Sequence, residues 1–283
     1  MRKFLVFILC LVASSAYGQQ DTAKVPDYGW KHSLVAGLTL TQVAFTNWAA
    51  GGQSALSWTT SLEGKSANDQ QITNWTTSYK FGFGQTRSGD QGLRKTDDKI
   101  DLETILTYKL GTYINPYAAA TFKSQFAKGF TYNDDAGTKT AVSQFFDPAY
   151  LTQSAGVEYQ PIPEVKTRFG AAVREIITSD FPSYADDPNT PEIEKTSVDG
   201  GLESVTNVEW KLEDNILFTS KLELFAPFDA LDEIVVRNDN TLAAKVSKYI
   251  TVILNVQLIN ERRITPRTQV KETLALGLSF TLL

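Results

Sequence analysis

From about Lys31 to the end of the chain, one pattern repeats roughly twelve times: a stretch of about 10 to 15 residues in which apolar and polar side chains alternate. Each stretch ends alternately in a tight turn or a longer polar loop. Alternation with a period of two places the apolar side chains on one face of a β-strand. Because a bilayer offers backbone groups no hydrogen-bond partner, strands can cross it only as a closed barrel.

The alternation can be followed in each stretch; for example, Ile100 and Leu102 alternate with Asp101 and Glu103. A soluble sandwich also alternates, but short turns that alternate with long loops are typical of a transmembrane barrel. The expected strands are 33–41, 56–63, 75–83, 99–109, 116–126, 152–159, 165–174, 202–210, 218–224, 234–246, 250–258 and 274–282. The short turns are expected at 111–112, 161–164, 211–215 and 248–249, and the long loops at 85–98, 127–148 and 178–196.

Aromatic residues support the same interpretation. They lie beside the expected short turns, as a ring at the periplasmic membrane interface would. These residues are Trp75, Tyr108, Tyr113, Tyr159, Trp210 and Tyr249. The sequence therefore predicts an all-β, antiparallel, up-and-down transmembrane β-barrel of about 12 strands, with both termini periplasmic.

The first 18 residues are typical of a secretory signal peptide that is cleaved after Gly18. This leaves residues 19–283 as one barrel domain in the bacterial outer membrane. Loss of Arg2 and Lys3 changes the formal net charge from −5 to −7, and loss of Cys10 leaves no cysteine. Such an acidic chain has no basic surface for nucleic acid, and no cofactor is expected.

A short motif follows the first expected strand: Asn47-Trp48-Ala49-Ala50-Gly51-Gly52. It resembles the N-terminal motif of an uncharacterised outer-membrane β-barrel family of the Bacteroidetes, domain of unknown function 3078. The resemblance implies the fold and the outer-membrane location, and it implies no catalytic residue. Physically, Gly51 and Gly52 suit a tight hairpin loop; alternatively, Trp48 folds inward or binds a partner.

Charged side chains of both signs alternate with the apolar ones, and we expect them to project into the lumen and pair there. They are Lys80, Lys99, Asp101, Glu103, Lys109, Arg168, Arg174, Glu203, Lys221, Glu223, Arg237 and Asp239. About twelve strands give a bore between the filled barrels of roughly eight strands and the open porins of roughly sixteen. The charges can therefore close the lumen as a network or line a narrow path for small polar solutes.

Enzyme chemistry has little support in the sequence. The only histidine, His32, begins the first strand at the periplasmic end, far from any expected nucleophile, so a hydrolase is the weakest hypothesis. The acidic loop segments 133–137 and 186–187 lack the complete spacing of a calcium-binding EF-hand loop. We therefore expect neither catalytic nor metal-binding residues.

Three arginines, Arg262, Arg263 and Arg267, fall in the last expected extracellular loop. They form either a solvated rim or a surface that contacts lipopolysaccharide phosphates. The sequence as a whole favours a non-enzymatic barrel that contacts outer-membrane lipids and lipopolysaccharide. Its role is either a component of an envelope assembly with other envelope proteins or a narrow channel.

Overall fold

The computed structural model describes residues 28–44, 53–187 and 190–283. Regular structure in these ranges is β-strand, apart from one short 3-10 helix, η1 (Pro182–Tyr184). No helix there has the length and apolarity needed to span a membrane. The strands are β1 (Gly29–Val43), β2 (Ala55–Asp69), β3 (Thr73–Ser88), β4 (Arg94–Tyr108), β5 (Ile114–Ser124), β6 (Gly129–Asn133), β7 (Thr138–Ser143), β8 (Ala149–Ile162), β9 (Val165–Ile177), β10 (Thr196–Glu213), β11 (Ile216–Pro227), β12 (Val235–Lys245), β13 (Ile250–Asn260) and β14 (Gln269–Thr281).

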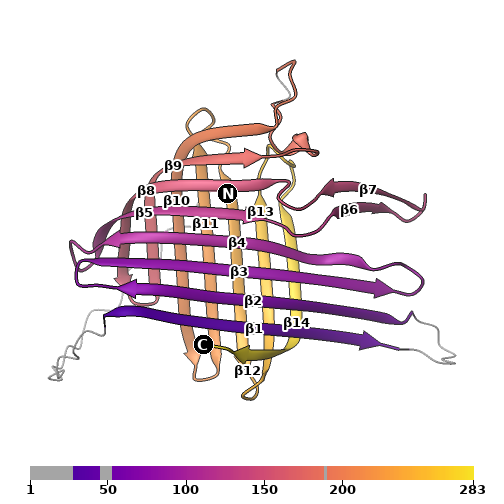
Figure 1. Cartoon of the computed structure of the whole chain (residues 1–283), viewed down its shortest axis with the longest axis horizontal. Coiled ribbons are helices and arrows are strands. Elements are labelled where there is room, and N and C mark those ends of the chain that lie inside the picture. Colours follow the sequence, from indigo (N-terminus) through magenta and orange to yellow (C-terminus); the bar gives the residue numbers. More distant parts are fainter. Residues whose placement is uncertain (1–27, 45–52, 188–189) are drawn as a thin grey trace, which may run out of the picture.

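Within the described ranges, twelve strands form a closed antiparallel barrel in the order β1-β14-β13-β12-β11-β10-β9-β8-β5-β4-β3-β2 (Figure 1). Each pairs with its neighbours along the chain, except that β5 pairs with β8 and β1 pairs with β14 to close the barrel. The hairpin β6–β7 leaves the barrel between these two strands and forms a sheet of its own. The predicted all-β barrel is confirmed, and each of the twelve expected strands lies on one barrel strand.

Burial along the strands is the reverse of that in a soluble protein. Arg168 and Glu158, at 2% and 3% exposure, are among the most buried side chains, whereas Leu274 is 77% exposed. Exposed large apolar side chains lie on every barrel strand except β11, where the apolar side chains are half-buried or buried, and the buried apolar cluster is small: Ala172, Phe225 and Val235. The alternation thus gives the barrel a polar interior and an apolar exterior.

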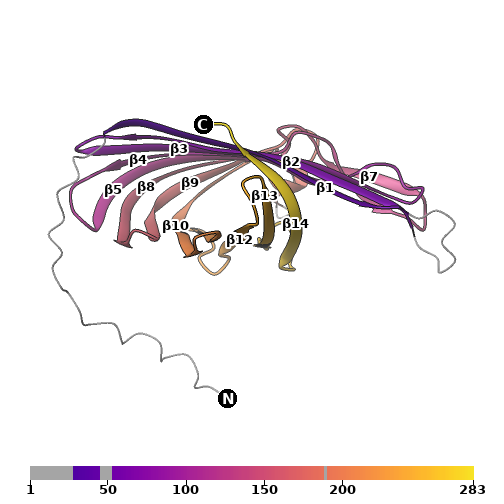
Figure 2. The ribbon, with the colours of Figure 1, turned by 90° about the horizontal axis from the view of Figure 1, so that it is seen from below.

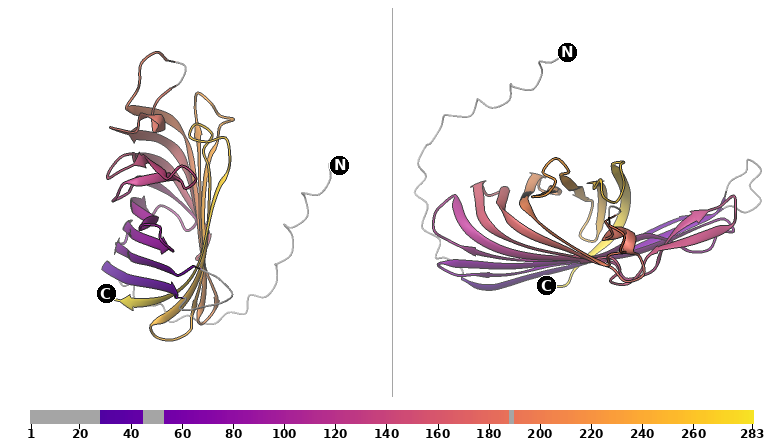
Figure 3. Two further views of the ribbon diagram at one scale, coloured as in Figure 1. Left: turned by 90° about the vertical axis from the view of Figure 1, so that its right-hand side faces the viewer. Right: turned by 90° about the horizontal axis from the view of Figure 1, so that it is seen from above.

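The barrel is flattened. In Figure 1, strands β1–β5, β8 and β9 cross the view in front of β11–β14, which run nearly at right angles to them. Such crossing follows when every strand tilts against the barrel axis. Figures 2 and 3 show the curvature of these walls, and they show that one end of the β1–β4 sheet extends past β14.

The two ends of the barrel differ. At one, which we call the turn end, short connections join β2–β3, β4–β5, β8–β9, β10–β11 and β12–β13. At the other, the loop end, the long connection 178–195 is confirmed and carries η1. The aromatic residues predicted beside the turns, Trp75, Tyr108, Tyr113, Tyr159, Trp210 and Tyr249, are all exposed.

Two predictions at the loop end are wrong. The predicted loop 85–98 contains only a short connection, because β3 continues to Ser88 and β4 begins at Arg94. The predicted loop 127–148 contains the β6–β7 hairpin. Residues 85–98 and β7 are largely polar, and β6 alternates only over Phe130 and Tyr132, so the sequence gives no clear strand signal there. Backbone pairing identifies these segments as strands.

Candidate functional site: the charged lumen

The closed barrel brings charged side chains from strands that are not neighbours into one interior. Glu103 on β4 forms ion pairs with Arg168 on β9 and with Lys221 on β11, at 3.2 Å between Lys221 Nζ and Glu103 Oε2. Glu223 on β11 pairs with Lys221 at 2.9 Å and with Lys123 on β5. Because β4 and β5 adjoin neither β9 nor β11, the pairs between these strands cross the lumen.

We call these five residues, Glu103, Lys123, Arg168, Lys221 and Glu223, the mid-lumen belt. The Arg168 side chain is 3% exposed and that of Lys123, the most exposed of the five, is 22% exposed. Charges buried to this degree persist only when each is paired. Each belt carboxylate meets two cations, so the belt satisfies this condition, and its ion pairs cross the bore.

A second cluster lies toward the loop end. Glu261 follows β13 and accepts hydrogen bonds from Arg174 at 2.5 Å and from Arg237 at 2.9 Å. Both guanidinium groups also approach the ring of Tyr150, at 5.4 and 5.0 Å from its centroid. We call Glu261, Arg174 and Arg237 the Glu261 cluster.

Two cavities show how the clusters divide the lumen. A cavity of about 50 Å³ is lined by members of both the belt and the Glu261 cluster, and by Glu203. A larger vestibule of about 600 Å³ extends from the belt residues Lys221 and Glu223 to the loop-end residues Phe130 and Tyr184. The vestibule therefore lies between the belt and the loop end.

The remaining predicted lumen residues have more varied surroundings. Lys99 pairs with Asp239 at 3.5 Å and with Asp101 at 3.8 Å. Lys80 lines the vestibule, and the described part of the chain gives it no ion pair. Glu203 is buried, and its Oε2 has no hydrogen-bond partner among the described residues.

Lys109 lies at the turn end of the barrel. It follows the end of β4, and its ammonium group binds Asp69 Oδ1 and the carbonyl of Gln70, both at 2.6 Å. The strand ends one residue before Lys109, and its long side chain joins the end of β4 to the β2–β3 turn.

In the predicted arginine rim, Arg263 pairs with Asp199 of β10 at 2.8 Å and with the loop residues Asp229 at 3.2 Å and Glu233 at 3.8 Å. Arg262 and Arg267 have no such ion pairs among the described residues. The acids that bind Arg263 are distant in sequence, which is why the sequence alone presents it as free for lipid phosphates.

Two other features considered in the sequence lie elsewhere. His32 is on the outer face, where its ring stacks on Trp30 with 5.7 Å between centroids and its Nδ1 lies 2.9 Å from Ser66 Oγ. The motif residues Asn47, Trp48, Gly51 and Gly52 lie outside the described residues, as does the predicted signal peptide.

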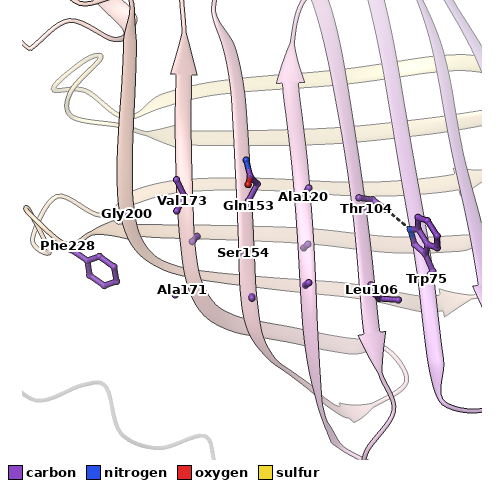
Figure 4. A pocket seen from close by; sticks show the side chains of 14 residues that line it. Trp75, Thr104, Leu106, Ala120, Gln153, Ser154, Ala171, Val173, Gly200 and Phe228 are labelled. Carbon is purple, nitrogen blue, oxygen red and sulfur yellow. Dashed lines mark hydrogen bonds between the residues drawn. The ribbon is translucent and has the colours of Figure 1, made fainter.

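On the outer face, a shallow groove of about 670 Å³ crosses β4, β5, β8 and β9. Small side chains, among them Ala120 and Ala171, form its floor, and Trp75 and Phe228 stand at its two sides (Figure 4). The Trp75 indole donates a hydrogen bond to Thr104 at 2.8 Å. The groove offers an apolar surface and no cluster of reactive groups among the residues that line it.

Residues 40–130 match the model of a family described as a protein of unknown function (DUF3078). The match covers less than half of the chain, from the end of β1 into β6, and includes the tryptophan motif. No curated protein matches the chain.

Solved structures with a similar fold include an outer membrane channel from Pseudomonas putida F1, with 12% identity, a TM-score of 0.41, and coverage of 94% of this chain and 99% of that one. The NanC porin has 13% identity, a TM-score of 0.39, and coverage of 88% and 100%. The translocator domain of the autotransporter NalP from Neisseria meningitidis has 9% identity, a TM-score of 0.38, and coverage of 92% and 90%. All three TM-scores are below 0.5, and the fold described above comes from the strand pairing of the chain itself.

Proposed function

We propose that this chain is a bacterial outer-membrane barrel that crosses the bilayer with its twelve barrel strands. The exposed apolar side chains of eleven of the twelve barrel strands support this proposal, because an apolar surface of this size would be unstable in water. Outer-membrane lipids would cover it, including the groove between Trp75 and Phe228. Cleavage of residues 1–18 and a source in the Bacteroidetes remain predictions.

The role we propose is non-enzymatic: a membrane component of an envelope assembly whose lumen is closed, rather than an open pore. The observation that carries this proposal is the mid-lumen belt, since its ion pairs span the bore between strands that do not adjoin. Native pull-down with mass spectrometry would identify the other envelope proteins of such an assembly.

Single-channel recording in planar bilayers tests the closed lumen. We expect the purified barrel to give no steady conductance, and a variant with Glu103, Arg168, Lys221 and Glu223 all changed to alanine to conduct, because it lacks the side chains that cross the bore. Retention of heat-modifiable gel mobility would show that the variant is folded. Steady conductance from the unmodified barrel would overturn the proposal.

The second candidate is a narrow channel for small polar solutes. The vestibule favours it, because an aqueous cavity of about 600 Å³ leads from the loop end to the belt. Transient opening of the belt would then admit a solute. Brief openings of the unmodified barrel in the same recordings, lost when the belt is cross-linked, would favour this candidate.

A further inference from the structure

The first and last strands close the barrel over only part of their length. Residues 35–39 of β1 pair with residues 277–281 of β14, whereas β1 pairs with β2 along its whole length. Beyond Thr39 the two strands diverge (Figures 1 and 2). In the described part of the chain, the edge of β14 from residue 269 to residue 276 has no strand partner on its β1 side.

The vestibule reaches this open seam. Gln269 and Lys271 of β14 line it, and the described residues that line it include none from β1 or β2. On this side, Lys271 Nζ lies 2.6 Å from Asp97 Oδ1 of β4. Because β1, β2 and β3 lie between β14 and β4 in the barrel order, this partly exposed ion pair spans the vestibule on the side of the seam, and we call it the latch.

We propose that the seam is a lateral portal through which an amphiphile with a zwitterionic headgroup enters the vestibule from the membrane. The portal rests on the proposed function, because it requires that the outer face of the barrel contacts lipid. Opening of the latch would let the headgroup pass, and the hydrocarbon chain would remain in the seam.

Two features of the seam and vestibule fit such a ligand. The outward side chains along the seam are apolar and highly exposed: Leu40 is 60%, Leu274 77% and Leu276 63% exposed. The vestibule lining carries seven basic and six acidic side chains, so it complements a headgroup with both charges better than one with a single charge. The mid-lumen belt blocks the way to the turn end, so the ligand would leave by the loop end or the portal.

An engineered disulfide can lock the portal. Thr39 pairs with Gly277, so continuing the same register by two residues would place Thr41 opposite Ala275. This would be a non-hydrogen-bonded pair, and in a closed antiparallel ladder the two Cα atoms of such a pair lie about 4.5 Å apart, close enough for a disulfide. The matched control is the pair Val35 and Thr281, which already adjoin. Both double variants, Thr41→Cys/Ala275→Cys and Val35→Cys/Thr281→Cys, are free of other thiols once Cys10 is removed.

The probe is phosphatidylethanolamine with a fluorophore on one acyl chain, and its retention by the purified barrel in mild detergent is measured. We expect oxidation of the Thr41→Cys/Ala275→Cys variant to abolish retention and reduction to restore it, with no change in the control pair. If the disulfide does not form, a bismaleimide of longer reach makes the same lock. Equal retention by locked and unlocked forms, or no saturable retention by either, would overturn the portal.

A latch variant gives a second measurement. We expect Lys271→Ala to speed probe uptake, since the vestibule loses the ion pair that spans it beside the seam, whereas Lys245→Ala at the turn end leaves the rate unchanged. Unchanged uptake after Lys271→Ala would count against the latch. Conductance depends on the belt, so failure of the portal would leave the test of the closed lumen unaffected.

Discussion

The carboxylate of Glu261 has both oxygens committed, one to Arg174 and one to Arg237, and the residue is 2% exposed. Because the cluster is buried, water cannot readily replace the carboxylate as a partner for either arginine. We therefore expect individual buried charged residues to contribute to the stability of this barrel as much as individual leucines contribute to the stability of a soluble protein.

We predict that Glu261→Ala lowers the free energy of unfolding by about 3–5 kcal/mol, because it leaves two buried guanidinium groups without their anion. Urea unfolding in detergent, followed by tryptophan fluorescence, measures the change. Glu272→Ala, at an exposed position of β14, is the matched control and should have little effect. Equal stability of the two variants would contradict the role of Glu261.

Single residues also show what the sequence could reveal about the lumen. Alternation was enough to place Glu103, Arg168 and Lys221 on the inward face. Their pairing was not predictable, because it joins strands that meet only when the barrel closes. Glu261 was missed because the strand was expected to end at residue 258. The inward positions of this strand are every second residue, and that series runs from Gln257 through Ile259 to Glu261.

Strands β8 and β9 leave no space for a side chain at one pair of facing glycines. Gly156 and Gly170 face each other directly in the ladder. A Cβ on Gly156 would lie 2.1 Å from the Phe169 carbonyl oxygen, and one on Gly170 would lie 2.2 Å from that of Ala155. In both cases the added Cβ would clash with a backbone carbonyl oxygen, so no rearrangement of a side chain could remove the clash.

We therefore predict that Gly156→Ala prevents β8 and β9 from pairing in this register and sharply reduces the yield of folded barrel. Heat-modifiable gel mobility of the outer-membrane fraction measures the yield. Gly92→Ala is the control, because a Cβ at that position would have no atom of the described chain within 4 Å. A normal yield for Gly156→Ala would show that the wall tolerates the extra atom.

The β6–β7 hairpin is attached to β4 through Arg94. Its guanidinium group donates hydrogen bonds to Asp134 and lies 4.2 Å from the centroid of the Tyr132 ring. The hydrogen bond from Arg94 lowers the pKa of Asp134 below its ordinary value of 3.8. This contribution to attachment is fully present above pH 3.8 and is lost as the pH falls through the lowered pKa.

We predict that the backbone amide hydrogens of the β6–β7 hairpin exchange with solvent faster once the pH falls below the lowered pKa of Asp134, after correction for the intrinsic exchange rate. Hydrogen exchange with mass spectrometry measures this, and Asp134→Asn should exchange fast at either pH. Identical pH profiles for the unmodified chain and Asp134→Asn would contradict the role of the ion pair.

The elements themselves were largely predictable, since apolar alternation identified every barrel strand. It failed where strands leave the lipid-facing wall. Segments 94–98 and 138–143 are largely polar on both sides, so only pairing distinguishes them from loops. The acidic segment 133–137, which lacks the spacing of a calcium loop, contains the turn that joins β6 to β7.

For the whole molecule, one property connects the fold with the proposed function: charges lie inside and hydrocarbon side chains lie outside. The sequence contains this arrangement as its period of two. It does not contain the partial closure between β1 and β14, which depends on how the tilted walls meet. The proposed closed lumen and the proposed portal both depend on that three-dimensional arrangement.

The orientation of alternate side chains on β13 in a bilayer tests this central property most directly. Nitroxide labels would be placed singly at Leu254 and Val256, which face outward, and at Ile253 and Gln257, which face inward. We predict that oxygen dissolved in the lipid relaxes the outward labels strongly and the inward labels weakly. Equal relaxation at all four positions, or strong relaxation of the outward labels by a water-soluble chromium complex, would contradict a lipid-facing exterior.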